Sequence, residues 1–222
     1  MPMIDVAPSV GSLGIGDLAP DLLLPDHEAE WVSFSSLWSA QPLLLVFLRH
    51  LECPHCRAYV MELAEEYQAI ADAGAHVALV SLGSSQDAAH FKQQKHVPFP
   101  ILADPDRQSY QAYGLGTTNL IEQISPKAIK HYLDDMRVGG GKGISLHQNM
   151  LQLGGTFLID TGGIIRYLYR STVIANRPDI DTLLESMLVY SYAHSSTLSA
   201  HQLTYRDCHL PRRAKTRSPF RG

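Results

Sequence analysis

The stretch PLLLVFL at residues 42–48 is the feature that most limits the folds open to this chain. Its apolar residues follow one another without alternation, which is the pattern of a strand covered on both faces. The run LLLVFL at 43–48 is also far too short to cross a bilayer. It therefore predicts a central strand in a sheet that has other elements packed on both sides.

Helical and extended patterns alternate after this run. From Pro54 to about Ala73, apolar residues recur at steps of three and four with acidic residues between them, which predicts an amphipathic helix that ends at Gly74. The segment AHVALVSLG at 75–83 predicts a second buried strand. A further helix is expected within SSQDAAHFKQQKH at 84–96, with a serine as its N-cap.

The remaining segments extend the same pattern on both sides of this core. They predict an entry hairpin with a helical turn, a short strand and helix, two strands joined by a Gly-rich turn, and a last helix: 19–38, 97–105, 106–115, 155–171 and 180–190. This order indicates an α/β fold in one domain at 14–190, with a flexible leader at 1–13. We expect a helical and Gly-rich insertion at 117–152 and a disordered tail at 191–222.

Charge and targeting features restrict the partners. The net charge of −4 gives no overall preference for nucleic acid or for an anionic membrane, so neither is expected as a partner. The N-terminus lacks the basic and apolar regions of a signal peptide, which predicts a reducing cytoplasm. The tail could still act as an electrostatic arm for an acidic partner or for the chain itself, because its basic residues outnumber the single Asp207. They are Arg206, Arg212, Arg213, Lys215, Arg217 and Arg221.

Two cysteines lie at the predicted junction of the central strand and the amphipathic helix. A thiolate of Cys53 would there meet unpaired backbone N–H groups and the positive end of the helix dipole, and Pro54 suits the first helical turn. Cys56 follows one turn later, within reach for a disulfide. We expect an exposed Cys53 thiol of low pKa to attack and a shielded Cys56 thiol to resolve the product. Neighbouring basic groups that could lower the pKa further are Arg49, His50, His55 and Arg57.

Other interpretations of the pair stay open at this point. The two thiols could be buried and unreactive. A zinc site would need further ligands, which only His50, His55 or the distant pair Cys208 and His209 could supply. Haem attachment of the c type is excluded, since Arg57 stands where that motif requires histidine. Cys208 is either an incidental exposed thiol or a mobile resolving thiol. We expect no cofactor and no metal.

Taken together, several blocks of the sequence resemble the alkyl-hydroperoxide-reductase/thiol-specific-antioxidant (AhpC/TSA) group of the thioredoxin superfamily, in its peroxiredoxin-like branch with a CxxC pair. The blocks are GDLAPDLLL, PLLLVFLRHLECPHCR, HVALVSLG, FPILADPDRQSYQAYGL and LGGTFLIDTGGIIRYLYRS. The resemblance covers about residues 14 to 190. It implies a thioredoxin-like fold with a central mixed β-sheet and helices on both faces, to which this chain adds its helical insertion.

The resemblance also implies roles for single residues. Cys53 corresponds to the attacking cysteine of thioredoxins and the peroxidatic cysteine of peroxiredoxins, and Cys56 to the thioredoxin resolving cysteine. His50 stands where peroxiredoxins place a threonine. Gly154 lies near the position of their active-site arginine, which is also where thioredoxins have a cis-proline. The dipeptide Pro54-His55 matches that of DsbA-type oxidases.

A thiol-disulfide oxidoreductase or an atypical peroxiredoxin-like antioxidant protein is therefore the implied function. Its substrate would be a peroxide or a disulfide, and its reductant an external thiol such as thioredoxin or a glutathione-like compound. The alternative is a redox-silent thioredoxin-like binding module in which the 117–152 insertion forms the partner surface.

Overall fold

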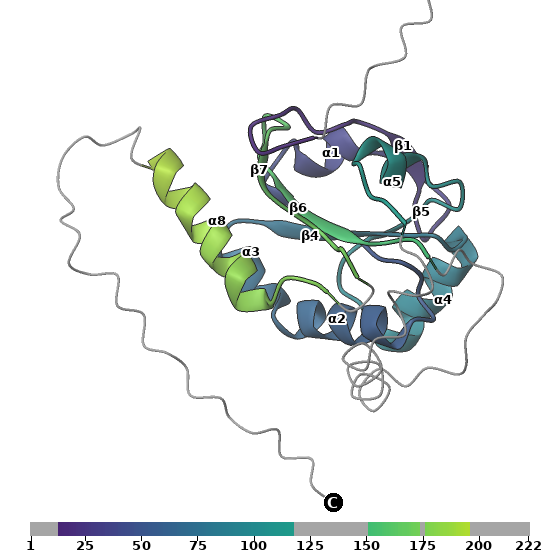
Figure 1. Cartoon of the computed structure of the whole chain (residues 1–222). Coiled ribbons are helices and arrows are strands. Elements are labelled where there is room, and N and C mark those ends of the chain that lie inside the picture. Colours follow the sequence, from purple (N-terminus) through teal and green to yellow (C-terminus); the bar gives the residue numbers. More distant parts are fainter. Residues whose placement is uncertain (1–12, 118–150, 174–175, 196–222) are drawn as a thin grey trace, which may run out of the picture.

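The computed structural model describes residues 13–117, 151–173 and 176–195, which form a five-stranded mixed sheet with helices on both faces (Figure 1). The strand order is β5-β4-β3-β6-β7, with β3 in the centre as its apolar run predicts. Strands β3, β4 and β5 are parallel, and β6 runs antiparallel to both β3 and β7. Their bounds are Leu43–Phe47 (β3), His76–Ser81 (β4), Ile101–Ala103 (β5), Gly155–Ile159 (β6) and Ile165–Arg170 (β7).

One hydrophobic cluster packs on each face of the five-stranded sheet. One face is covered by helices α2 (Pro54–Glu65), α3 (Tyr67–Asp72), α4 (Ser85–Lys95) and α8 (Ile180–Ser195). The other is covered by α1 (Phe34–Trp38), α5 (Gln108–Ala112) and the hairpin of β1 (Leu23–Pro25) and β2 (Trp31–Ser33). The predicted thioredoxin-like α/β class is confirmed.

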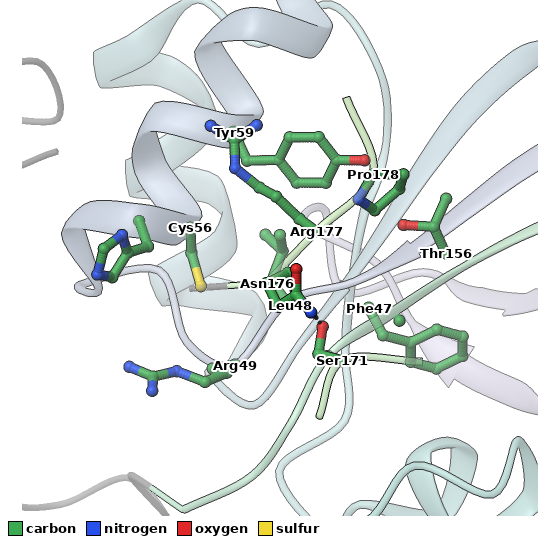
Figure 2. A pocket seen from close by; sticks show the side chains of 13 residues that line it. Phe47, Leu48, Arg49, Cys56, Tyr59, Thr156, Ser171, Asn176, Arg177 and Pro178 are labelled. Atoms are coloured by element: carbon green, nitrogen blue, oxygen red, sulfur yellow. Dashed lines mark hydrogen bonds between the residues drawn. The ribbon is translucent and has the colours of Figure 1, made fainter. Parts of the chain in front are cut away.

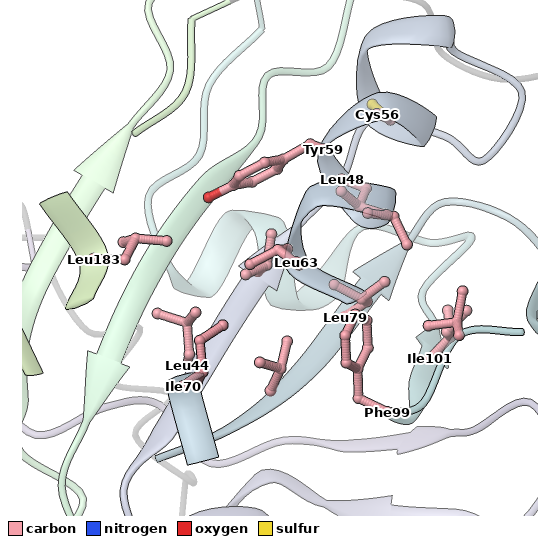
Figure 3. Close-up of a cluster of buried hydrophobic side chains, with 14 of the residues drawn as sticks. Leu44, Leu48, Cys56, Tyr59, Leu63, Ile70, Leu79, Phe99, Ile101 and Leu183 are labelled. Atoms are coloured by element: carbon pink, nitrogen blue, oxygen red, sulfur yellow. The ribbon is translucent and has the colours of Figure 1, made fainter. Parts of the chain in front are cut away.

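Strand β3 shows why its sequence does not alternate. Leu44 and Val46 point into the cluster under α2, while Leu43 and Leu45 point into the opposite cluster, and each of these side chains is at most 1% exposed. Side chains from α2, α3 and α8 meet the first face, among them Leu63 (Figure 3). A strand that is buried on both sides has no position that favours a polar residue.

The long helix expected from Pro54 to about Ala73 is divided in two. Glu66 has φ −96° and ψ 10°, so α2 ends there and α3 begins at the next residue. Gly74 does end the helical segment, with a φ of 86° that favours glycine. The expected serine cap is also present, since Ser84 and Asp87 form a capping box at the start of α4.

Tyr110 of α5 fixes the end of β3, which leads into the cysteine pair. Its fully buried hydroxyl donates to the backbone carbonyl of Leu48 and, at 3.1 Å, to that of Val80. The backbone N–H of Leu48 donates in turn to the Val80 carbonyl at 2.8 Å. Hydrogen bonds to α5 and to β4 therefore fix the point where the loop after β3 begins.

The two ends of the predicted insertion meet at one point of the fold. Thr117 pairs with Gln152 in an isolated antiparallel bridge. The Gln152 side chain is 2% exposed, and its amide nitrogen donates to the carbonyls of Leu115, Gly116 and Leu153 at 3.2, 2.9 and 3.1 Å. Buried amide donors satisfied in this way hold both ends of the segment against the body of the domain.

Several predicted features fall outside the described residues. These are the helix and Gly-rich turn inside 118–150, most of the leader and most of the tail, so the proposed domain limits stay predictions. In the described parts of the chain, none of the helices combines the length and the apolar character needed to cross a bilayer.

Candidate active site

Cys53 is the N-cap of α2, as its place in the sequence predicts. Its backbone is extended, with φ −68° and ψ 123°, and its carbonyl accepts the first helical hydrogen bond from Arg57 at 2.9 Å. Pro54 occupies the first helical turn, where a missing N–H costs nothing. The Cys53 sulfur therefore lies at the end of the helix where the dipole stabilises negative charge.

Arg49 gives the Cys53 thiol a charged hydrogen-bond donor. Its Nη2 donates to Cys53 Sγ at 3.1 Å, and the Arg49 residue is 7% exposed. The pKa of Cys53 is held well below its usual value by the hydrogen bond from the Cys56 side chain and then by the charge of Arg49, against the opposing effect of burial. Arg49 Nε and Nη1 have no hydrogen-bond partner among the described residues.

The pKa of Cys56 is shifted in the opposite direction. Its hydrogen bond to Cys53 and its burial raise the pKa of the Cys56 thiol well above the usual value. Both cysteines are present as free thiols. The opposite shifts make Cys53 the more readily ionised thiol of the pair, which is the difference that attack by one sulfur and resolution by the other require.

The expected exposure of the two thiols is wrong. Cys53 is 1% exposed and Cys56 9%, so both residues are buried and Cys53 is not the exposed member of the pair. The cause is the loop between β3 and α2, which places Leu51 in the same core cluster as Cys53 and lays the Arg49 side chain against the sulfur. The Cys53 sulfur is thus shielded from bulk water in the reduced protein.

The two histidines beside the pair, which the sequence offers as basic groups that could lower the pKa of Cys53, are buried as well. His50 is 3% and His55 5% exposed. Burial lowers the pKa of His50, although the negative charge of Cys53 acts in the other direction. Neither ring nitrogen of His50 has a hydrogen-bond partner within the described ranges. His50 is therefore neutral near pH 7, and its weak electrostatic effect on Cys53 is secondary to that of Arg49.

A small hollow of about 40 Å³ opens beside Cys56 (Figure 2). A volume of this size holds a water or another molecule of a few atoms. Side chains and backbone from the end of β3, the start of α2, the start of β6 and the segment after β7 line it: Phe47, Leu48, Arg49, His55, Cys56, Tyr59, Gly154, Gly155, Thr156, Ser171, Asn176, Arg177 and Pro178. Cys53 is not among them.

Arg177, which sequence reasoning missed, holds the rim of this hollow to α2. Its guanidinium forms two hydrogen bonds with the Glu62 carboxylate, at 2.6 and 2.7 Å, and lies 4.5 Å from the centre of the Tyr59 ring. We refer to Arg177, Glu62 and Tyr59 as the rim clamp. No short motif could have revealed it, because Arg177 and Glu62 are separated by 115 positions in the chain.

Gly154 lies next to the pair but has no room for a side chain. A Cβ at this position would stand 2.4 Å from the backbone carbonyl oxygen of Phe47, the last residue of β3. At the position where the resemblance places an arginine or a cis-proline, this chain therefore has a glycine whose backbone lies close against the backbone of β3. Arg49, in the loop after β3, reaches the Cys53 sulfur instead.

Replacing Gly154 by alanine should consequently destabilise the fold by about 1–3 kcal/mol, since the clash is with backbone that cannot rotate away. The free energy of unfolding from urea titration measures this change. Gly116→Ala is the matched control, because a Cβ at Gly116 meets nothing within 4 Å. Equal stability of the Gly154 and Gly116 variants would contradict the predicted clash.

The described part of the chain provides no further ligands for a zinc site at the cysteine pair. There, no three His, Cys, Asp or Glu side chains gather in a way that could hold a metal ion. Cys208 and His209, the other ligands considered, lie outside the described residues.

Comparisons with known proteins agree with this geometry. The model of the AhpC/TSA family matches residues 15–168. The thioredoxin-like protein AAED1, chloroplastic, of Arabidopsis thaliana is 23% identical over 184 residues, which cover 78% of this chain and 73% of that protein. Prostamide/prostaglandin F synthase of Danio rerio is 24% identical over 185 residues, covering 80% of this chain and 90% of its own.

Among solved structures, peroxidoxin BcpB from Mycobacterium tuberculosis has the same fold, with a TM-score of 0.60 at 19% identity over 80% of this chain and 97% of its own. The matched family region begins just before β1 and reaches into β7, so it contains the whole cysteine pair and its loop. It spans well over half of the chain. The chain therefore belongs to the AhpC/TSA family, as a peroxiredoxin-like, thiol-dependent oxidoreductase of the thioredoxin superfamily.

Proposed function

We propose that this protein reduces a small peroxide, with Cys53 as the attacking thiolate and Cys56 as the resolving thiol, and that an external thiol in a reducing cytoplasm regenerates the pair. The observation that carries the proposal is the Arg49 hydrogen bond to Cys53 Sγ at the N-terminus of α2. With the hydrogen bond from Cys56, which has the larger effect, it lowers the pKa of Cys53 and so favours the thiolate, which is the reactive form.

The reaction proceeds in two steps. The Cys53 thiolate attacks one peroxide oxygen, the O–O bond breaks, and Cys53 becomes a sulfenic acid while the second oxygen leaves as hydroxide or alkoxide and takes up a proton. Cys56 then loses its proton and attacks the Cys53 sulfur, which forms the disulfide and releases water. Two thiols lose two electrons in total, and the peroxide gains them.

The burial of the pair favours a peroxide over a protein disulfide as the substrate. Cys53 is 1% exposed, and the hollow next to the pair holds about 40 Å³. A molecule of two to a few heavy atoms can enter such a space, whereas a disulfide on another protein would first have to displace the loop that carries Leu51. The name of the solved peroxidoxin agrees with this choice.

Mass spectrometry of the reduced, full-length protein after mild treatment with hydrogen peroxide tests the proposal. We expect the mass of two hydrogen atoms to be lost, with the change confined to a disulfide between Cys53 and Cys56 and absent in Cys53→Ser. Cys208→Ser serves as the matched control and should still form the disulfide. If no disulfide appears across a range of redox buffers, the redox proposal fails in favour of the binding module, and stoichiometric zinc would support the metal site instead.

A further inference from the structure

The resolving step of the proposed reaction needs an acceptor for one proton. Cys56 must lose its proton before its sulfur can attack, yet its hydrogen bond to Cys53 and its burial raise the pKa of this thiol well above the usual value. Burial also limits the contact of Cys56 with bulk water, since the residue is 9% exposed. A base inside the protein would therefore speed the step at neutral pH.

His50 lies against both cysteines. Its backbone carbonyl accepts a hydrogen bond from the Cys53 N–H at 3.2 Å, and its backbone also forms a hydrogen bond with the Cys56 thiol. The charge of the His50 ring and that of the Cys53 thiolate act on one another as well. The turn between His50 and Cys53 thus holds a titratable side chain next to the reacting pair.

The His50 ring has nitrogens available for a proton. It is 3% exposed, and neither ring nitrogen takes part in a hydrogen bond with the residues that the structure describes. Such a ring is uncommon in a protein interior, where buried polar groups are normally hydrogen-bonded. Two other groups near the pair cannot serve as the base. The Arg49 guanidinium has no acceptor atom, and burial raises the pKa of the Tyr59 hydroxyl, which keeps its proton.

From these observations we infer that His50 is the base of the resolving step and carries one proton from Cys56 to the departing oxygen. The inference rests on the sulfenic acid of the proposed function. A ring nitrogen of neutral His50 takes the proton of the Cys56 thiol, and the new thiolate attacks Cys53 Sγ. The S–S bond forms, the S–O bond breaks, and the departing hydroxide takes the proton from the imidazolium to become water. His50 is then neutral again.

The pH dependence of the resolving step follows from the charge state of His50. Burial has the largest effect on this ring and lowers its pKa from the usual 6.5, while the charged groups that act on it are Cys53, Arg49 and Glu52. The neutral, basic form is therefore complete above the usual value and is lost as pH falls through the lowered pKa. The rate of disulfide formation from the sulfenic acid should be level above about pH 7 and fall at acid pH.

Rapid quenching of the full-length protein in a Cys208→Ser background measures the two steps separately. The reduced protein is mixed with an equivalent of hydrogen peroxide and stopped with acid, and mass spectrometry distinguishes the sulfenic acid from the disulfide. In His50→Gln the disulfide should form about a hundredfold more slowly at neutral pH. The sulfenic acid should still form at nearly the original rate, because the effect of His50 on Cys53 is secondary to that of Arg49. His90→Gln, at an exposed histidine of α4, is the matched control.

The pH profile gives a readout that a purely structural role would not change. In His50→Gln the level region should be replaced by a rate that rises about tenfold per pH unit, because Cys56 must then ionise without a base. Equal slowing of both steps would overturn the inference, and so would a level region that persists in His50→Gln but is lost in His55→Gln. A resolving rate that climbs steadily above neutral pH in the unsubstituted protein would overturn it even if His50→Gln does not fold. Failure of that protein to form either oxidised species would instead count against the proposed function.

Discussion

Cys53→Ser should abolish peroxide reduction, with a loss of about a thousandfold or more that leaves only the background rate. Cys53 is the sulfur that receives the Arg49 hydrogen bond and caps α2, and a serine hydroxyl at the same place stays protonated and does not attack. The measurement is the consumption of hydrogen peroxide in the presence of excess thiol. Cys56→Ser should behave differently, because it keeps the attacking sulfur and loses only the resolving one.

The Cys56→Ser protein should consume about one equivalent of peroxide in a single rapid turnover and then stop or slow. Its mass should show one added oxygen on Cys53, the sulfenic acid, followed by further oxidation as peroxide is increased. Rapid turnover that persists in Cys53→Ser, or an equally complete loss of the first turnover in Cys56→Ser, would contradict the assigned roles.

Arg49→Met should move the pH dependence of Cys53 oxidation upward by about one to two pH units. The thiolate is the reactive form, so the rate rises as pH rises through the pKa of Cys53 and is lost as pH falls below it. Arg49 contributes to holding that pKa well below the usual value. Without the guanidinium the pKa rises, and each unit lowers the thiolate fraction about tenfold on the acid side of the profile.

Arg57→Met is the matched control for this change. Arg57 lies on α2 close to the same pair, but its guanidinium lies 5.6 Å from the centre of the Phe91 ring and its Nη2 donates to Gln94 at 3.5 Å. The same charge and the same side-chain size are removed, and the profile should move far less. The profile of oxidation rate against pH, with alkylation at the quench, checks both variants. Equal shifts of the two pH profiles would mean that Arg49 acts only as one of several nearby positive charges and not through its hydrogen bond to Cys53.

Much of the fold and the position of the pair can be predicted from the sequence, because both follow from local patterns. The unbroken apolar run identifies β3, and a cysteine followed by proline before a helical pattern places Cys53 at the cap and Pro54 in the first turn. These features depend only on residues that are close in the sequence, so they can be predicted without knowing how the rest of the domain packs. The division of the long helix at Glu66 has no comparable signal in the sequence.

Long-range packing is the part that the sequence pattern does not contain. Four basic residues flank the cysteines, and only the folded chain shows that Arg49 turns to the sulfur while Arg57 turns to Phe91. The expected exposure of Cys53 follows from the access that an attacking thiol needs, and no local pattern shows that Leu51 packs in the core cluster that contains Cys53. In the sequence, Glu62 has the pattern of a solvated helix residue. In the fold it forms an ion pair with Arg177, which is distant in the chain.

The bridge between Thr117 and Gln152 has a consequence for how this protein can change over evolution. Both ends of the intervening segment are fixed at one point, by the bridge and by three hydrogen bonds from a single buried amide. Insertions and deletions between two such closely spaced anchors cost little loop-closure entropy and leave the register of the sheet unchanged. A change in the length of that stretch should therefore leave the framework around the cysteines in place.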